Sequence, residues 1–371
     1  METWKKIRLG SACRTNTDSY SPKEKWDFVN YLDTGNITNN TIDSIQFIDL
    51  TKEKLPSRAR RKVRTDSIVY STVRPNQHHF GIIKSQPENF LVSTGFTVID
   101  VDTNVLNADF LYYLLTQNTL VEALHAIAEQ STSAYPSIKT SDIENLEIEI
   151  PDILTQKKIA NILNSLDGKV TQNNEINKNL EQQAQAIYQQ MFIENQNPNW
   201  KEGKLSDLVA VKYGKDHKKL DGGCYPVYGS GGIMRYVEKP LYTGESVLIP
   251  RKGTLNNVMY VNGAFWSVDT MFYTEMLRPN IAKFVYHFVK GKDLASLNAG
   301  SAVPSMTTNI LNAMPLYVPD DETLSIFEET VTPMYSQMQE NEKQSANLAN
   351  IRDTLLPRLM SGELEVSDID L

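Results

Sequence analysis

The chain has 371 residues, a length that suffices for two or three domains, and a net charge of −8 from 37 Lys and Arg against 45 Asp and Glu. Hydrophobic residues make up 40% of the sequence, which excludes a disordered chain. Two isolated cysteines, Cys13 and Cys224, exclude a disulfide scaffold and a structural zinc site. The sequence shows no signal peptide and no stretch of 18 apolar residues, so we expect a cytoplasmic protein without membrane contact, and the negative charge taken alone argues against a nucleic-acid partner.

The first segment of the chain, residues 1–150, mixes strand and helix patterns. Residues 69–73 and 90–99 are rich in β-branched and aromatic residues, which predicts two strands. Asn107 precedes a helical pattern of apolar residues that we expect to run to about Ala128. We therefore predict a small α/β domain over this segment.

The loops of this segment carry side chains that suit DNA. Residues 57–64 hold five positive charges, and residues 74–79 combine Arg, Asn, Gln and His, the residue types that contact phosphates and base edges. A basic loop that is simply solvated is the alternative for such a run. We predict phosphate contacts by Arg58, Arg60, Arg61, Lys62 and Arg64, and base contacts by Arg74, Asn76 and Gln77.

Residues 151–196 form a polar segment with the period of a long helix. Apolar and amide residues recur at alternating steps of three and four, which indicates the heptad seam of a coiled coil. A helix packed only on its own domain would show a similar stripe, so that alternative stays open. The predicted seam consists of Leu163, Leu166, Val170, Asn173, Leu180, Ile187 and Met191.

One pattern in this segment is typical of an enzyme. Pro151-Asp152 and Asp167-Gly-Lys169 fit the loose PD…DxK pattern of metal-dependent nucleases, whose carboxylates hold a divalent ion. These residues straddle a helix where a strand pair would be needed, and residues 335–337 of the second helical segment do not repeat the pattern. Phosphate-binding loops, zinc-protease motifs, nucleophile elbows and amino-methyltransferase motifs are absent from the sequence. We therefore predict neither catalytic residues nor a metal site.

The second globular segment, residues 197–319, repeats the mixture of strands and turns. Residues 246–249 and 265–273 predict strands. The loops combine Gly with Lys, Arg and Asn, and glycine allows a backbone to approach a phosphate closely, although a surface turn is the common alternative for a lone Gly-Ser-Gly-Gly run. The predicted DNA contacts are Lys218, Lys219, Ser230, Gly231, Arg251, Lys252, Asn256 and Asn257.

The last segment, residues 320–371, carries a second and poorer seam. Arg352 stands on this seam and Pro333 lies inside the helical pattern, so we expect a kink or a late start of the helix. Gly362 favours a helix end. The predicted seam residues are Met334, Met338, Asn341, Leu348, Leu355 and Leu359.

The two halves of the chain form an internal repeat. At an offset of 168 residues, Ser137 corresponds to Ser305 and Asn173 to Asn341. Because the first helix leads from one globular segment to the other and the second must return, we predict that the helices pair antiparallel. The two asparagines would then meet and fix the register of the pair.

The net charge is unevenly distributed along the chain. Residues 200–319 contain 14 Lys and Arg against 9 Asp and Glu, whereas residues 320–371 contain 3 against 12. Residues 1–150 contain 16 against 19. The negative charge therefore stems mainly from the last segment, and the second globular segment is basic enough for a nucleic-acid partner.

The order of these segments is similar to that of a known family over the whole chain. The run from Pro151-Asp-Ile-Leu-Thr-Gln-Lys-Lys to Tyr188-Gln-Gln-Met-Phe marks the first helix, and Ile351-Arg-Asp-Thr-Leu-Leu-Pro-Arg-Leu-Met closes the second. Gly229-Ser-Gly-Gly-Ile and Thr243-Gly-Glu-Ser-Val match more loosely. The chain resembles the specificity (S) subunit of type I restriction-modification systems.

The resemblance implies an α/β fold in which two small target recognition domains are separated by two long antiparallel coiled-coil helices, with a pseudo-two-fold internal repeat. The recognition domains would be residues 1–150 and 197–319, and the conserved helical regions residues 151–196 and 320–371. The resemblance further implies a non-catalytic subunit that binds double-stranded DNA. Each domain would read one part of a split, asymmetric sequence, and the helices would set the spacing.

The resemblance also implies protein partners. Two methyltransferase subunits that bind S-adenosylmethionine would dock on the chain, and restriction subunits that use ATP and Mg would join them. The chain itself would carry no cofactor. A scaffold that binds only proteins, and the metal-dependent nuclease, are the alternative functions.

Overall fold

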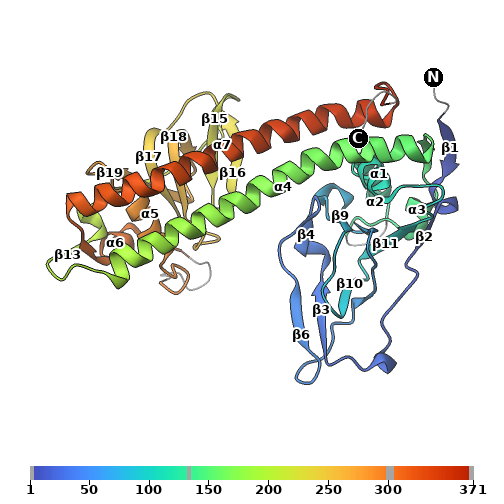
Figure 1. Ribbon diagram of the computed structural model, residues 1–371, viewed down its shortest axis with the longest axis horizontal. Helices are drawn as coiled ribbons and strands as arrows, with labels where there is room; N and C mark the ends of the chain where they lie inside the picture. Colours follow the sequence, from blue (N-terminus) through green and yellow to red (C-terminus); the bar gives the residue numbers. More distant parts are fainter. Residues whose placement is uncertain (1–3, 132–134, 298–304, 367–371) are drawn as a thin grey trace. The chain divides into compact units, whose positions relative to one another are not determined.

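The computed structural model describes residues 4–131, 135–297 and 305–366 (Figure 1). The chain divides into two compact units. Unit 1 comprises residues 1–172 and 344–371, and unit 2 comprises residues 173–343. Each unit therefore holds one globular segment together with parts of both long helices, α4 (Ile153–Gln189) and α7 (Asp321–Met360). None of the helices in the described ranges is long and apolar enough to cross a membrane.

Besides its parts of α4 and α7, the described residues of unit 1 form short strands and three short α-helices. Its helices are α1 (Ala108–Leu115), α2 (Asn118–Glu129) and α3 (Thr140–Glu144). Its strands are β1 (Lys5–Arg8), β2 (Cys13–Thr15), β3 (Phe28–Leu32), β4 (Ile37–Thr38), β5 (Thr41–Ile42), β6 (Gln46–Asp49), β7 (Ala59–Arg61), β8 (Ser67–Ser71), β9 (Phe80–Ile83), β10 (Phe90–Ser93), β11 (Phe96–Val101) and β12 (Glu147–Ile150). They form two four-stranded sheets, β6-β3-β10-β7 and β2-β11-β8-β9, and the pairs β1-β12 and β4-β5.

Unit 2 has a single larger sheet. Its strands are β13 (Lys201–Lys204), β14 (Val209–Tyr213), β15 (Tyr225–Gly229), β16 (Gly232–Val237), β17 (Tyr242–Pro250), β18 (Met259–Ser267), β19 (Met271–Met276) and β20 (Pro315–Val318), and its short helices are α5 (Ala282–Lys290) and α6 (Thr308–Asn312). Six strands pair in the order β14-β19-β17-β18-β15-β16, and β13 pairs with β20. The order β14-β19-β17-β18 matches β2-β11-β8-β9 of unit 1, so the internal repeat extends to the sheets.

Three predicted elements are divided in the structure. Residues 90–99 form two strands, β10 and β11, because the chain turns at Gly95, where a side chain would lie 2.8 Å from Thr34 Cγ2. Residues 265–273 likewise contribute to both β18 and β19. The single helix expected from Asn107 breaks into α1 and α2, because Gln117 has an extended backbone at the start of α2.

Both long helices begin at the aspartates of the repeated Pro-Asp pair. Asp152 Oδ1 accepts hydrogen bonds from the backbone amides of Leu154 and Thr155, and Asp320 Oδ1 accepts one from Thr323. Such caps satisfy amide groups that have no partner inside the helix. In α4 the helix continues into a π-helical turn, Gln190–Glu194.

The late start expected for the second helix is wrong, because α7 is helical from Asp321 through Pro333. Pro333 lies on the exposed face, where water can bind the carbonyl group that its missing amide leaves free. The helix ends at Met360, and Gly362 follows with a φ of 72° and donates its amide to Leu359. The glycine therefore terminates the helix as expected.

Within each unit the two helices pair antiparallel (Figure 1). Asp167 contacts Arg352 in unit 1, while in unit 2 Asn173 contacts Asn341, and the rings of Tyr188 and Phe327 lie 6.2 Å apart. All thirteen predicted seam residues are buried or half-buried. The helices also pack on the globular parts, since Leu163 and Leu359 belong to the main core of unit 1 and Tyr188 and Phe327 to that of unit 2.

The seam of unit 2 contains a small network of amides. Asn341 Nδ2 donates to Asn177 Oδ1 at 2.7 Å, Asn177 Nδ2 donates to the Met338 carbonyl at 3.1 Å, and Asn173 Nδ2 donates to the Asn341 carbonyl at 3.4 Å. Asn173 is 1% exposed and Asn341 is 6% exposed. Buried amides of this kind fix the register of a helix pair at a cost in stability.

Replacing both Asn173 and Asn341 by Leu is expected to raise the free energy of unfolding by about 1–2 kcal/mol, because apolar burial replaces desolvated amides. The pairing should at the same time become less register-specific. Urea unfolding measures the first effect, and cross-linking between cysteines placed at alternative registers of the seam measures the second. A marked loss of stability would contradict this role of the asparagines.

Candidate nucleic-acid interface

The predicted base-contacting residues of unit 1 lie on a hairpin loop. Loop A, residues 72–79, joins the antiparallel strands β8 and β9. The Arg74 amide donates to the Pro136 carbonyl at 2.9 Å, and the Ile138 amide donates to the Thr72 carbonyl at 2.8 Å. These bonds tie loop A to the segment that precedes α3.

Arg74 has a constrained conformation in this loop. Its φ is 47°, in the left-handed region, and its guanidinium carbon lies 5.2 Å from the centre of the Tyr135 ring. Asn76 and Gln77 follow in a short 3-10 turn, Pro75–Gln77, and both are exposed. The structure therefore places the three predicted base contacts together on one loop that is anchored by backbone hydrogen bonds.

Unit 2 has an equivalent loop that is held in the same way. Loop B, residues 251–258, joins the antiparallel strands β17 and β18. The Met306 amide donates to the Arg251 carbonyl at 2.9 Å, and Lys252 forms a β-bridge with Ser305. In unit 1 the corresponding bridge joins Val73 to Ser137. The repeated serine segment thus anchors both loops, which the sequence repeat alone did not reveal.

The structure gathers several predicted residues of unit 2 around loop B. The guanidinium carbon of Arg251 lies 5.4 Å from the centre of the Tyr213 ring, and Asn257 Nδ2 donates to the Ser230 carbonyl at 2.7 Å. Lys252 is exposed, as is Gly231 beside Ser230. Loop B and the β15–β16 turn therefore form one continuous surface.

Other predicted residues of unit 2 are placed differently. Asn256 holds the neighbouring chain, since its Nδ2 donates to Asp293 Oδ1 at 3.1 Å and its Oδ1 accepts from the Ala295 amide at 3.0 Å. Lys218 and Lys219 are exposed on the segment between β14 and β15, and among the described residues neither side chain forms a hydrogen bond or ion pair with loop B. The Asn256 side chain thus stabilises the fold of the neighbouring loop, and the two lysines form a separate basic site on the surface.

The basic run of unit 1 is less free than its sequence indicates. Residues 59–61 form the edge strand β7, so the run is only partly a loop. The Lys62 ammonium pairs with Glu24 and lies 5.3 Å from the Trp26 ring centre. Arg61 is half-buried, and burial lowers the pKa of its guanidinium. Arg64 donates to Thr17 Oγ1 at 3.0 Å.

Two arginines of this run are exposed, and one of them, Arg58, lies near loop A. Arg58 and Arg60 are both exposed, and the Arg58 carbonyl accepts a hydrogen bond from Thr94 at 2.8 Å. The next residue, Gly95, accepts one from the Thr72 amide at 2.8 Å. The Thr94–Gly95 turn therefore places Arg58 beside loop A.

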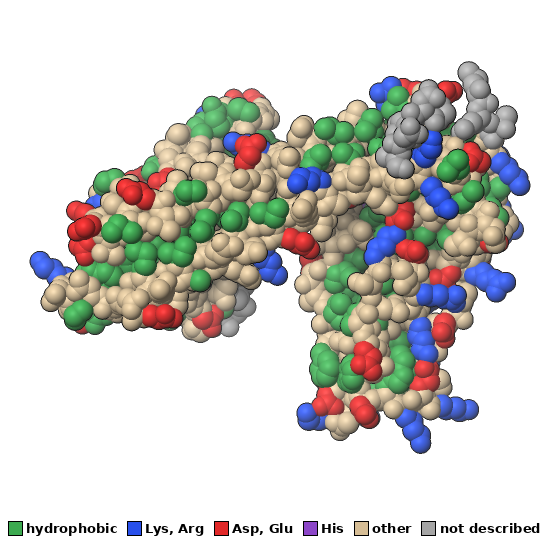
Figure 2. All heavy atoms as spheres, viewed as in Figure 1, with side chains coloured by type: hydrophobic (Ala, Val, Ile, Leu, Met, Phe, Trp, Pro, Cys, Tyr) green, Lys and Arg blue, Asp and Glu red, His purple; other side chains and the backbone are tan. Residues whose placement is uncertain are grey.

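The surface of unit 1 has no single basic face in the view of Figure 2, where Lys and Arg alternate with Asp and Glu. This face of unit 1 (Figure 2) therefore offers a polyanion little long-range attraction. Contacts to DNA would depend on the exposed arginines and on loop A.

The carboxylates of the nuclease pattern cannot share a metal ion. Asp152 caps the start of α4, and Asp167 stands 15 residues later, about 22 Å along a helix. Asp167 Oδ1 lies 2.6 Å from Arg352 Nη1, and its Oδ2 accepts a hydrogen bond from Tyr113 at 2.7 Å. Among the described residues, no three His, Cys, Asp or Glu side chains are grouped as metal ligands.

Comparison with known proteins identifies the family. The family described as the type I restriction modification DNA specificity domain matches residues 1–182 and 197–347. The HindI specificity subunit of Haemophilus influenzae is 23% identical, over 98% of this chain and 100% of that protein. The MjaIX specificity subunit of Methanocaldococcus jannaschii is 22% identical, over 98% and 94%. The crystal structure of the type I S subunit from M. genitalium is 18% identical with a TM-score of 0.58, over 96% of each chain, and shares the fold.

Proposed function

The chain belongs to the family of type I restriction-modification DNA specificity subunits, and from this premise we propose that each of its two α/β domains reads one part of a split, asymmetric DNA sequence. The family is non-catalytic and carries no cofactor itself. The proposal assigns the reading to loop A in residues 1–150 and to loop B in residues 197–319.

The similar anchoring of the two loops is the observation that carries this proposal. Both join antiparallel strands and are bonded to the repeated serine segment, yet their side chains differ. Loop A presents Arg74, Asn76 and Gln77, whereas loop B presents Arg251 and Lys252. Two equivalent loops with different side chains would recognise two different DNA sequences.

The backbone of Arg74 supports its role as a reader. Arg74 is one of nine described residues other than glycine with a positive φ, a backbone conformation that costs free energy and recurs at functional positions. At the corresponding position of loop B, which follows the bridge residue Lys252, Gly253 has a φ of 85°. An arginine at the position where a glycine would fit best is explained if its guanidinium binds a base edge.

The long helices would set the distance between the two parts of the DNA sequence. A helix of 37 residues, the length of α4, is about 55 Å long. DNA presents the same face about every 34 Å, so two readers at such a distance would leave an unread spacer. Residues 151–196 and 320–371 would hold the two reading domains at this distance. They would also dock the other subunits of the complex, two methyltransferase subunits and the restriction subunits. S-adenosylmethionine, ATP and Mg would act in those subunits.

Methylation by the assembled complex tests the proposal. The full chain is co-expressed with its methyltransferase partner, and the DNA of the cell is sequenced for methylated adenine. A split, asymmetric motif is expected. If the partner binds and no motif is methylated, the chain is a scaffold and the proposal is wrong.

Arg74→Ala is expected to relax one base position of one half of the motif, because a bidentate arginine contact contributes about 1–3 kcal/mol to discrimination against the wrong base. The other half should remain unchanged. Binding of the complex to a panel of oligonucleotides with single base changes measures this effect. Uniform weakening for all sequences would reassign Arg74 to phosphate contact.

Arg60→Ala provides the contrasting result. Its guanidinium is exposed on β7, and we assign it to a phosphate. Binding should weaken to a similar degree for all sequences, and the slope of log K against log salt should fall by about one. A change in base preference would contradict this assignment.

A further inference from the structure

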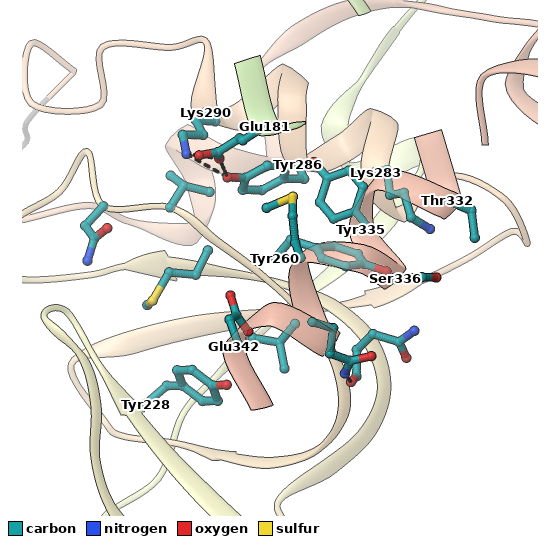
Figure 3. Close-up of a pocket in the computed structure, with 17 residues that line it drawn as sticks. Glu181, Tyr228, Tyr260, Lys283, Tyr286, Lys290, Thr332, Tyr335, Ser336 and Glu342 are labelled. Atoms are coloured by element: carbon teal, nitrogen blue, oxygen red, sulfur yellow. Dashed lines mark hydrogen bonds and ion pairs between the residues drawn. The ribbon is translucent and has the colours of Figure 1, made fainter. Parts of the chain in front are cut away.

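Unit 2 contains a cavity of about 350 Å³ between its sheet, α5 and α7 (Figure 3). Its wall includes four tyrosines, Tyr228, Tyr260, Tyr286 and Tyr335, and the carboxylates of Glu181 and Glu342. Tyrosine rings and carboxylates are the groups that hold organic cations in proteins. The arrangement of these groups shows which of them are already occupied.

Two lysines of α5 fill two tyrosine and carboxylate sites in this cavity. The ammonium nitrogen of Lys283 lies 5.3 Å from the Tyr260 ring centre and 5.7 Å from that of Tyr335, and it pairs with Glu245 at 3.1 Å. Lys290 repeats the arrangement. Its ammonium nitrogen lies 5.1 Å from the centre of the Tyr286 ring and pairs with Glu181. Each cation is thus held by an aromatic ring and by a carboxylate.

The fourth tyrosine, Tyr228, and the carboxylate of Glu342 have no lysine or arginine partner among the described residues. Figure 3 shows Tyr228 and Glu342 at one end of the cavity, away from Lys283 and Lys290. Their proximity is reflected in the Tyr228 hydroxyl, since burial and then the charge of Glu342 raise its pKa to about 12. Glu342 makes neither a hydrogen bond nor an ion pair with the residues that the structure describes.

We propose that the Tyr228 and Glu342 end of this cavity binds the cationic end of an aliphatic guanidinium or amine. Glu342 serves as its counter-ion and Tyr228 as its aromatic neighbour. Met338 and Val261 also line the cavity and suit the alkyl chain of such a ligand. The site lies outside the proposed DNA contacts, apart from Asn257, which lines the same cavity and also bonds Ser230.

The charge balance favours a cation over an anion or a neutral ligand. Lys283 and Lys290 are the cations that line the cavity, and both are paired with carboxylates. Glu328 adds a further negative charge beside Lys283. An anion at the Glu342 end would meet an unpaired carboxylate, whereas a cation completes the third pair.

Isothermal titration of the full chain with agmatine tests the site. Agmatine carries both a guanidinium and an amine on a butyl chain, and N-butylurea has a similar shape without charge. We expect saturable binding of agmatine and no measurable binding of N-butylurea. Glu342→Gln should weaken agmatine binding about tenfold or more, as loss of a charged hydrogen-bond partner does.

Matched variants separate a local effect from a general one. Glu340→Gln removes a charge from the same helix that is exposed, as Glu342 is, but does not line the cavity, and it should leave the affinity unchanged. Tyr228→Phe keeps the ring and should bind like the parent, whereas Tyr228→Leu should bind several-fold more weakly, with an unchanged thermal transition as evidence of folding. Equal binding of N-butylurea, absence of binding by the parent chain, or unaltered affinity of Glu342→Gln would overturn the proposal.

A second measurement distinguishes the sources of the cation. The titration is repeated with the complex of this chain and its methyltransferase partner. Loss of agmatine binding in the complex, with weaker assembly of Glu342→Gln, identifies an Arg or Lys side chain of the partner as the occupant. Unchanged binding identifies a free amine of the cell.

Discussion

Lys283→Met is expected to lower the free energy of unfolding of unit 2 by about 3–5 kcal/mol, because it leaves a buried carboxylate without its cation. Lys283 is 3% exposed and pairs with Glu328, which is 9% exposed and comes from α7. Glu328 Oε2 has no hydrogen-bond partner among the described residues. Burial raises the pKa of Glu328 despite the attraction of Lys283, which shows how costly its charge is at this position.

Two further variants define the origin of this loss. Lys283→Met combined with Glu328→Leu should recover much of the stability, since an apolar pair can replace a buried ion pair at little cost. The second carboxylate beside Lys283, Glu245, is less buried and keeps the hydrogen bond from the Tyr260 hydroxyl. Lys212→Met removes a cation whose pair with Glu275 is exposed, and it should cost less than about 1 kcal/mol. Urea unfolding at neutral pH measures all three. A loss for Lys283→Met no larger than for Lys212→Met would contradict the prediction.

The internal repeat and the helix pairing could be predicted from the sequence because both are periodic. The seam residues recur at heptad spacing, and the Asn173 and Asn341 pair meets within unit 2 as expected. The order of the segments required an antiparallel pair. The contact in unit 1 between Asp167, in the first half of α4, and Arg352, near the end of α7, agrees with that direction. Arg352 on the apolar seam is thereby explained by its partner.

Features that depend on contacts between distant residues could not be predicted. Lys62 was expected at a phosphate, but its partner Glu24 lies 38 residues away in the sequence. The same holds for Asn256, whose bonds to residues 293–295 follow from the fold of a loop. Lys283, Glu328 and His287 were not selected at all, because charged and polar residues in an amphipathic helix usually face water.

The predicted base contacts are an intermediate case. The residue types of loop A and loop B indicated DNA, whereas the way in which the loops are held did not follow from their own sequences. A match between Ser137 and Ser305 could be read from the repeat, but the bridges to Val73 and Lys252 require the folded sheets. The sequence signal that could have indicated this anchoring was the repeated segment around Ser137 and Ser305, which had no evident role.

Acidification is expected to destabilise unit 2 through His287, with the free energy of unfolding falling by about 3 kcal/mol between pH 6.5 and pH 4. His287 is 0% exposed, and burial lowers its pKa to about 4. The nearby Glu181 opposes this shift and Lys290 adds to it. In the unfolded chain the His287 imidazole has its ordinary pKa of 6.5 and binds a proton in this pH range, whereas in the folded chain it does not. Full stability is therefore present above pH 6.5 and is lost as the pH falls towards 4.

Hydrogen bonds explain why the folded state keeps this imidazole neutral. His287 Nδ1 lies 2.7 Å from Gln185 Oε1, which can only accept, so Nδ1 carries the hydrogen. Nε2 then accepts the hydroxyl hydrogen of Tyr335 at 2.9 Å. Protonation of Nε2 would reverse that bond, so that the Tyr335 hydroxyl accepts, and would place a charge in a buried site beside the rings of Tyr188 and Phe327.

Urea unfolding of the parent chain and of His287→Gln between pH 7.5 and pH 4 measures the effect. The variant should be less stable at pH 7.5, because it loses ring contacts, but its stability should decline less as the pH falls. His125→Gln is the matched control, since His125 is only partly buried and lies beside Glu129 on α2. It should retain the full acid-induced loss. An identical pH dependence of the parent chain and His287→Gln would show that this proton is not taken up on unfolding.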